Sequence, residues 1–403
     1  MTSPARRIAI VLSGGGARGA YEAGVLSYIF EHVSRQLERP VHFDIITGTS
    51  VGAVHACYLA GSQQHDECGR GLIDIWRAMS FDSVMSLSTT AVLRVPWRMF
   101  GFGMAPVPDG SRIAGLFDTS GLEALVARAV GWRALRENID AGRLVGLAVA
   151  ATEIASGKTV VFVDRSDGLS LPCSGDPLVV TSKAQITAQH ALASAAIPMI
   201  FPAVRIGPRF YSDGGLRMNT PLAPALRMGA DRVLVIGLRH AEAGAPSDVD
   251  EEREAVAQSP IYLAGKALNA LLLDSVEYDL ERLRLFNEIL HGGVAEYGAD
   301  FVDRINVPVV ARRGHPYKIV ESLFIRPSRD LGVEAAECLR TQLRSASGSR
   351  LRRTLLGYLA DSEVSEADFL SYLYFDACYA ERLVAMGRSD AAAAEEALVA
   401  FFT

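Results

Sequence analysis

A short apolar strand that ends in glycines and leads into a helix occurs twice within the first 60 residues, and this repeat restricts the possible folds strongly. The run Arg7–Ser13 is followed by Gly14–Gly16, and apolar residues then recur at helical spacing over residues 17–37. A second strand, Phe43–Thr47, leads into a helix expected from about Val51. Strands separated by helices in this way pair in parallel and carry helices on both faces of the sheet.

The alternation continues to about residue 240. Further short apolar runs of strand length lie at Leu144–Ala151, Thr159–Val163, Arg209–Ser212 and Arg232–Leu238. We therefore expect an α/β fold with a mainly parallel central sheet over residues 1–240.

The second part of the chain has a different pattern. Residues 241–260 are acidic and contain two prolines, which is typical of a linker or loop. Apolar residues spaced by three or four from Leu268 to Leu290 then predict a long amphipathic helix, and Lys318–Arg326 predicts a strand. We expect residues 261–403 to be mostly helical and to pack on the first unit.

One segment interrupts the alternation. Residues 91–110 combine bulky apolar side chains with glycine and proline and have no clean period. They predict an irregular packed insertion. The alternative is a lid or a membrane-contacting surface, where exposed apolar residues would have a purpose.

Charge and composition argue against several classes of protein. The formal net charge of -6 gives no sign of the basic face that nucleic-acid binding requires. The five cysteines are scattered and never form a CxxC pair, which disfavours a zinc site or a disulfide framework and suits a reducing compartment. No run approaches the roughly 20 apolar residues of a spanning helix, and the N-terminal apolar run is too short for a signal peptide. We expect a cytoplasmic protein with peripheral membrane contact.

The turn Gly48-Thr49-Ser50-Val51-Gly52 has a chemical implication. A serine between two glycines, after an apolar strand and before a helix, is typical of a nucleophile elbow, whose strained turn holds the hydroxyl clear of the sheet. Because Gly48 and Gly52 have no side chains, they leave room around Ser50 in the turn. The N-terminus of the following helix would favour negative charge nearby. The alternative is an ordinary strand-to-helix turn with serine as the helix cap.

The loop Gly14-Gly15-Gly16-Ala17-Arg18-Gly19 follows the first strand. Glycine-rich turns that open a helix expose backbone N–H groups able to hold a phosphate or an oxyanion. A dinucleotide site would place an acidic residue at the end of the second strand, where this chain has the serine turn instead. We therefore expect an oxyanion loop with the N–H groups of Gly15, Gly16 and Ala17 as donors. Arg18 could bind a phosphate or brace the loop, and we favour bracing.

The sequence Asp213-Gly214-Gly215 supplies a candidate base. Asp-Gly is a common turn and also occurs at Asp109 and Asp167. Only at Asp213 does an apolar strand precede the pair and a second glycine follow it. Partial burial without a cationic partner would raise the pKa of this carboxyl and let it accept the proton of Ser50.

In this order, the motifs resemble those of the patatin-like phospholipase family. The resemblance covers about residues 7–240 and includes GGGARGAYEAGVL (residues 14–26), GTSVGA (residues 48–53), ALASAAIPMIFPAV (residues 191–204) and the DGG at Asp213. SLFIRPSRDLG (residues 322–332) resembles the C-terminal part of some bacterial members. The resemblance implies a three-layer αβα sandwich, a catalytic domain over residues 1–240 and a Ser50–Asp213 dyad. It also implies hydrolysis of lipid carboxylic esters, in phospholipids or lysophospholipids, with no metal and no cofactor.

Three alternatives stay open. A Ser-His-Asp triad would recruit His55 or His190, the histidines nearest the motifs, although no later histidine lies in a comparably marked turn. An acyltransferase or neutral-lipid esterase would use the same dyad with another acceptor or substrate. A non-catalytic lipid-sensing module would keep only the fold. The oligomeric state is likewise open.

Overall fold

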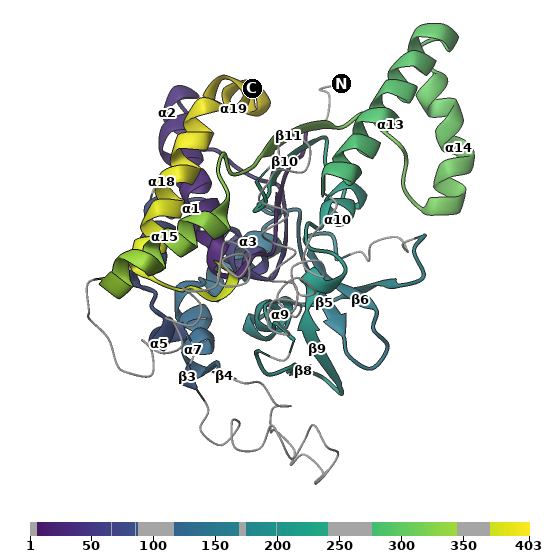
Figure 1. The fold of residues 1–403 in the computed structure, drawn as a ribbon. Coiled ribbons are helices and arrows are strands. Elements are labelled where there is room, and N and C mark those ends of the chain that lie inside the picture. The colour runs from purple at the N-terminus through teal and green to yellow at the C-terminus, as the bar shows by residue number, and fades with distance from the viewer. Residues whose placement is uncertain are drawn as a thin grey trace, which may run out of the picture.

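The computed structural model describes residues 6–65, 67–84, 86–87, 117–168, 175–198, 200–240, 276–344 and 371–403. Both the irregular segment predicted at residues 91–110 and the linker predicted at residues 241–260 lie outside these ranges. The described elements form one main sheet with helices on both of its sides (Figure 1).

The main sheet consists of β1 (Ile8–Leu12), β2 (Ile45–Thr49), β5 (Gly146–Glu153), β6 (Thr159–Arg165), β7 (Val179–Lys183), β8 (Val204–Ile206), β9 (Arg209–Asp213), β10 (Arg232–Ile236) and β11 (Glu321–Ile325). The order is β11-β10-β1-β2-β5-β6-β7, with β9 paired to β5 and β8 to β9. Strands β11 to β5 in this order are mutually parallel, whereas β6 and β9 run antiparallel to β5. The predicted mainly parallel α/β sheet is confirmed. A separate ribbon pairs β3 (Ser86–Leu87) with β4 (Phe117–Asp118).

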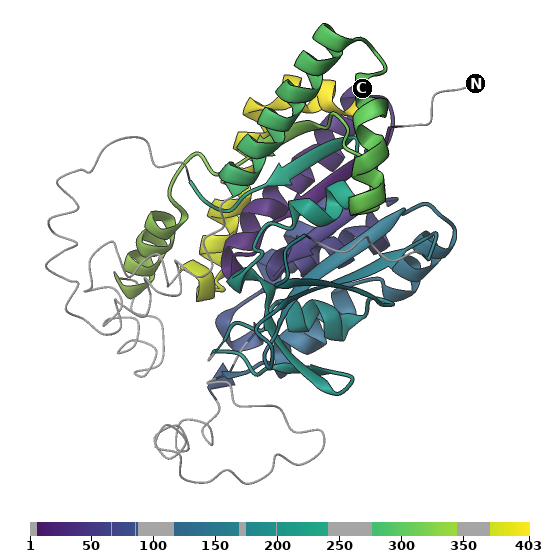
Figure 2. The same cartoon turned by 90° about the vertical axis from the view of Figure 1, so that its right-hand side faces the viewer.

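Helices cover both faces of the sheet and give the predicted three layers (Figure 1; Figure 2). The larger apolar core lies under α1 (Gly19–Tyr28), α3 (Val51–Ser62), α4 (Cys68–Ala78), α7 (Ser120–Ala129), α8 (Trp132–Asp140), α9 (Ala188–Ser194), α15 (Leu331–Arg344), α18 (Ala377–Ala393) and α19 (Glu395–Phe402). On the opposite face, α10 (Leu222–Arg227) and α13 (Val276–Tyr297) cover the smaller core. α13 continues into α14 (Phe301–Arg313), and this pair rises at the upper right of Figure 1. Shorter helical turns are η1 (Gly16–Arg18), η2 (Ile29–Val33), α2 (Ser34–Gln36), α5 (Phe81–Val84) and η3 (Gly214–Leu216).

The continuous apolar runs of the strands supply both cores, because successive side chains point to opposite faces of a sheet. In β1, Ile10 and Leu12 belong to the larger core, while Ala9 and Val11 belong to the smaller one. A strand buried on both faces needs an unbroken apolar sequence rather than an alternating one. This requirement explains why the run Arg7–Ser13 is a reliable strand signal.

Elements from the C-terminal part of the chain complete the sheet and one helical layer. β11 extends the sheet beside β10, and α18 packs along α1, seen as the yellow and purple helices in Figure 1. The helix predicted from Leu268 is described from Val276 and continues to Tyr297. The division into residues 1–240, 241–260 and 261–403 stays a prediction.

The contact between α1 and α18 depends on two glycines. A Cβ built at Gly24 would lie less than 3.0 Å from the backbone of Val384, and one built at Gly387 equally close to the Tyr21 carbonyl. Because backbone atoms cannot move aside as a flexible side chain can, larger residues would force the two helices apart.

We expect Gly387→Ala to lower the free energy of unfolding by about 1–3 kcal/mol, because the added methyl group overpacks the contact with α1. Chemical unfolding followed by circular dichroism measures this. The matched control is Gly292→Ala on α13, where a Cβ would meet nothing within 4 Å. This control should be neutral or stabilising by up to about 1 kcal/mol, since alanine favours a helix over glycine. Equal effects of the two substitutions would contradict the close helix contact.

Candidate active site

Two strands share one edge of β5, and their ends meet there. β2 runs parallel to β5 and pairs as far as Thr49 with Ala150. β9 runs antiparallel and pairs as far as Asp213 with Ala151. The carboxyl ends of β2 and β9 therefore meet head to head at adjacent positions of β5. Because Ser50 follows Thr49 directly, this pairing brings the serine turn to Asp213.

Ser50 stands in a strained turn at the start of α3. Its φ of 55° and ψ of -126° are rare for a residue with a side chain and cost roughly 1–3 kcal/mol. Its backbone N–H donates to Ser194 Oγ at 2.8 Å, and the Ser194 hydroxyl donates in turn to the Ala150 carbonyl at 2.6 Å. These two hydrogen bonds tie the strained turn to α9 and to β5.

Glycines allow the close packing around this turn. A Cβ built at Gly48 would lie less than 3.0 Å from the Gly52 carbonyl. One built at Gly52 would approach the Leu12 carbonyl as closely, and one at Gly214 the Ala150 carbonyl. The two predicted elbow glycines and the first glycine of the DGG thus lie where backbone segments touch.

Ser50 and Asp213 are in direct contact. The Ser50 hydroxyl donates to Asp213 Oδ2 at 2.6 Å, and the Gly215 N–H donates to Asp213 Oδ1 at 2.7 Å. Only 1% of Asp213 and 5% of Ser50 is exposed. Burial raises the pKa of Asp213 to about 7, and the hydrogen bonds from Ser50 and Gly215 offset this only in part. A carboxylate with such a pKa can accept a proton near neutral pH.

The glycine-rich loop passes beside Ser50. The Gly14 N–H donates to the Asn219 carbonyl and the Gly14 carbonyl accepts from Asn219 Nδ2, both at 3.0 Å. Gly16 has a φ of +55° and lies so close to the Tyr372 carbonyl that a side chain would not fit. Within the described residues, the N–H groups of Gly15, Gly16 and Ala17 have no hydrogen-bond acceptor. They are therefore available as donors to a bound oxygen. Gly19 begins α1.

The Arg18 side chain contacts the C-terminal part of the chain. Its side chain is buried, its Nε donates to Ser371 Oγ at 2.7 Å, and its Nη1 donates to the Tyr372 hydroxyl at 3.4 Å. The guanidinium also lies 4.0 Å from the centre of the Tyr372 ring. These contacts agree with the bracing interpretation and fix the loop to a segment about 350 residues away in the chain.

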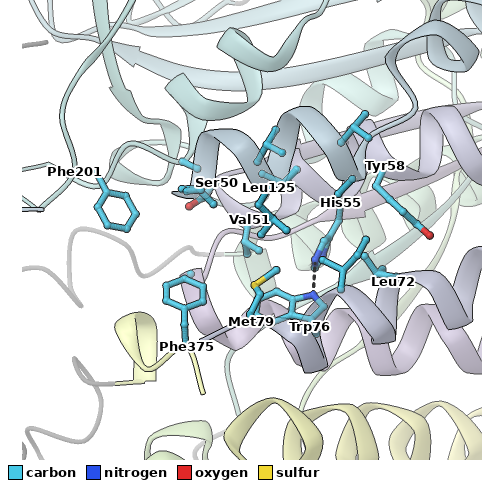
Figure 3. A pocket seen from close by; sticks show the side chains of 18 of the residues that line it. Ser50, Val51, His55, Tyr58, Leu72, Trp76, Met79, Leu125, Phe201 and Phe375 are labelled. Atoms are coloured by element: carbon cyan, nitrogen blue, oxygen red, sulfur yellow. Dashed lines mark hydrogen bonds between the residues drawn. The ribbon is translucent and has the colours of Figure 1, made fainter. Parts of the chain in front are cut away.

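An apolar pocket begins at Ser50 and follows α3 (Figure 3). α3 contributes Val51, Val54 and Tyr58 to its lining, at the spacing of one helix face, and Tyr58 lies at the end away from Ser50. The other walls come from α4 and α7, with Phe201 and Phe375 close to Ser50. The empty space in and around this pocket, with its open mouth and adjoining solvent included, is about 670 Å³.

The two candidate histidines make other contacts. Both ring nitrogens of His55 are occupied, by Glu22 Oε2 at 2.7 Å and by Trp76 Nε1 at 3.0 Å. His190 Nδ1 lies 3.2 Å from the Thr187 N–H at the start of α9, and burial lowers the pKa of His190 to about 4. The carboxylate of Asp213, rather than a histidine, contacts the Ser50 hydroxyl.

Sequence reasoning missed three residues that hold the site: Ser194, Asn219 and Tyr372. Ser194 lies inside an alanine-rich stretch, and Tyr372 lies in a region of the chain without any motif. Their roles depend on which segments meet in space, and a single sequence carries no local signal for that.

The fold is a mainly parallel α/β sheet in which a serine turn between a strand and a helix lies beside a buried carboxylate. A model of the family described as patatin-like phospholipase matches residues 10–226, more than half of the chain. The chain therefore belongs to the patatin-like phospholipase family, whose members are lipid acyl hydrolases. The crystal structure of VipD from Legionella pneumophila is similar at 12% identity and a TM-score of 0.31, covering 92% of this chain and 67% of that one. Comparison with curated proteins gave no match.

Among the described helices, none has both the length and the apolar character needed to cross a membrane.

The raised pKa of Asp213 has a consequence for stability. The folded protein binds this proton more tightly than the unfolded chain, because the pKa rises from 3.8 to about 7. The stability that this group contributes is full below about pH 4 and is lost as the pH rises to about 7. We expect Asp213→Asn to be more stable than wild type at pH 8, by at most about 4 kcal/mol, and equal to it near pH 4.

Urea unfolding at pH 4, 6 and 8 measures this difference. Asp231→Asn is the control: burial raises the pKa of Asp231, but hydrogen bonds from Lys318 and the Arg7 N–H outweigh burial and lower it overall. This control should be less stable than wild type at pH 8. A constant difference between Asp213→Asn and wild type across the pH range would contradict the raised pKa.

Proposed function

We propose that the protein hydrolyses carboxylic esters of phospholipids or lysophospholipids, with Ser50 as nucleophile and Asp213 as its base. The observation that carries this proposal is the hydrogen bond of 2.6 Å between the Ser50 hydroxyl and a buried carboxylate. Family membership supports lipid substrates, and the apolar pocket beside Ser50 suits an acyl chain.

In the proposed reaction, Asp213 accepts the proton of Ser50 as the hydroxyl oxygen attacks the ester carbonyl. Its pKa of about 7 makes it a better base than an exposed aspartate while leaving it largely ionised above neutrality. Protonated Asp213 then releases the alcohol, and water cleaves the acyl-enzyme by the same route in reverse. The chemistry needs neither a metal nor a cofactor.

The N–H groups of Gly15, Gly16 and Ala17 are the proposed donors to the oxyanion of the tetrahedral intermediate. They lie on a loop that packs beside Ser50 and have no other acceptor among the described residues. Each such donor typically contributes about 3–4 kcal/mol to the stability of the transition state.

The proposed substrates imply work at a membrane surface, by peripheral contact from the cytoplasm. Residues 1–240 would form the catalytic domain, and the C-terminal region would support it through β11 and α18. Sedimentation with phospholipid vesicles tests the membrane contact, and a protein that stays entirely in the supernatant would argue against it.

Fatty-acid release from a mixed phospholipid extract, measured by mass spectrometry, tests the proposed activity. We expect release by wild type and loss of at least about a thousandfold in Ser50→Ala and Asp213→Asn. For a neutral ester, kcat/KM should rise with pH and level off above about pH 7, because Asp213 must be ionised to act as base. Activity that is equal in wild type and Ser50→Ala would refute the proposal and favour a lipid-sensing module. Acyl transfer to an added alcohol in preference to water would favour an acyltransferase.

The pocket along α3 predicts a dependence on acyl chain length. Each methylene buried there contributes up to about 0.8 kcal/mol, or roughly fourfold in kcat/KM. Val54→Trp should block the pocket and remove this gain for decanoyl esters by about tenfold or more, while acetyl esters are cleaved as before. Nitrophenyl esters of increasing chain length measure the effect. An equal loss with acetyl and decanoyl esters would argue against acyl binding along α3.

A further inference from the structure

A series of buried hydrogen bonds links helices α1, α3 and α4 to the residue before the proposed oxyanion loop. Glu22 on α1 is fully buried, and each of its carboxylate oxygens faces a donor. Oε1 accepts from the Ser13 backbone N–H at 2.9 Å, and Oε2 lies 2.7 Å from His55 Nδ1. The indole N–H of Trp76 donates to His55 Nε2 at 3.0 Å, as the dashed line in Figure 3 shows. The side chains of His55 and Trp76 are almost fully buried as well.

The side-chain chemistry decides which atom donates in each of these hydrogen bonds. Trp76 Nε1 can only donate, so His55 Nε2 must be the unprotonated nitrogen. Nδ1 of a neutral ring then carries the proton and donates to Glu22. Burial raises the pKa of Glu22, whereas the hydrogen bonds from His55 and the Ser13 N–H lower it.

Two residues of this hydrogen-bond chain, Ser13 and His55, lie next to the proposed catalytic machinery. Ser13 directly precedes Gly14 at the end of β1, where the loop begins. His55 lies on α3, the helix that starts at the residue after Ser50. One carboxylate therefore joins the base of the loop to the helix that carries the nucleophile.

We propose that Glu22 is a positioning residue. Through its hydrogen bonds to Ser13 and His55, it keeps the N–H groups of residues 15–17 correctly placed relative to Ser50. The proposal rests on the proposed ester hydrolysis. An ionisable group in an apolar core costs several kcal/mol unless its partners compensate, and the proposed reaction does not itself use Glu22. A displacement of about 1 Å between donors and nucleophile can cost about a hundredfold in rate.

Only a carboxylate fits this place. A carboxylate accepts hydrogen bonds at both oxygens, whereas the amide of glutamine has one acceptor and one donor end. In Glu22→Gln, the amide NH₂ must face either the Ser13 N–H or His55 Nδ1. If it donates to Nδ1, the proton of His55 moves to Nε2 and opposes the indole N–H of Trp76. Glutamine therefore breaks at least one of these hydrogen bonds, although its side chain has nearly the shape and volume of glutamate.

The experiment compares Glu22→Gln and Trp76→Phe with the matched control Glu334→Gln. Glu334 is also a buried glutamate with both oxygens engaged, but by Arg329 and Arg382 on the C-terminal part of the chain. Three quantities are measured: kcat and KM for a phospholipid or nitrophenyl ester, the affinity of a trifluoromethyl ketone, and hydrogen exchange of the peptide covering residues 13–19. The ketone forms an oxyanion with the nucleophile, so its affinity reports on the donors directly.

We expect kcat in Glu22→Gln to fall by about 10–100-fold, with KM changed less than about threefold. The affinity for the ketone should fall by the same factor, and amides of residues 13–19 should exchange faster. Trp76→Phe should show smaller changes in the same direction. Glu334→Gln should lower the unfolding midpoint without these effects on kcat, ketone affinity or exchange.

A purely structural role for Glu22 gives a different result. In that case, Glu22→Gln would lose stability as the control does, but keep kcat per active site, ketone affinity and exchange, and the proposal would be wrong. An inactive wild type would instead refute the proposed hydrolysis. Exchange in residues 13–19 would then decide alone whether Glu22 orders the loop: faster exchange in Glu22→Gln supports this, and unchanged exchange overturns it.

Discussion

Two strands that run in opposite directions, β2 and β9, pair with the same edge of β5. The arrangement of the site follows from the point where these two strands meet. β2 ends opposite Ala150 and β9 ends opposite Ala151, so the residues that continue from both strands converge. A register slip of one residue in β9 would turn the Asp213 side chain to the other face of the sheet. The antiparallel pairing of β9 with β5 thus places a carboxylate within hydrogen-bond distance of Ser50.

Close backbone contacts surround this junction. Glycines at the serine turn and in the first loop let main chains touch where any side chain would separate them. On the outer side, α18 closes over α1 through Gly24 and Gly387, and the segment before α18 supplies Ser371 and Tyr372 to Arg18. The loop is therefore held by hydrogen bonds to Asn219 and to the C-terminal part of the chain.

Two buried carboxylates, Asp213 and Glu22, differ in their partners. Burial raises the pKa of both Asp213 and Glu22. Asp213 receives one backbone N–H and a hydroxyl that can itself lose a proton, which suits a base. Glu22 receives two N–H donors, from Ser13 and His55, which suits a fixed anchor. The same side-chain chemistry in two settings thus supports the two different roles proposed for them.

The sequence by itself determined the mainly parallel sheet, the family and the positions of the glycine loop, the serine turn and the DGG, because each depends on a local pattern of strand, glycine and helix. It could not give the pairing of β9 with β5, the cover of α1 by α18, or the contacts of Ser194, Asn219 and Tyr372 with the site. These join segments far apart in the chain, so only the packed structure decides them. His55 and Glu22 illustrate the difference: 33 residues separate them in sequence, and burial in one core makes them partners.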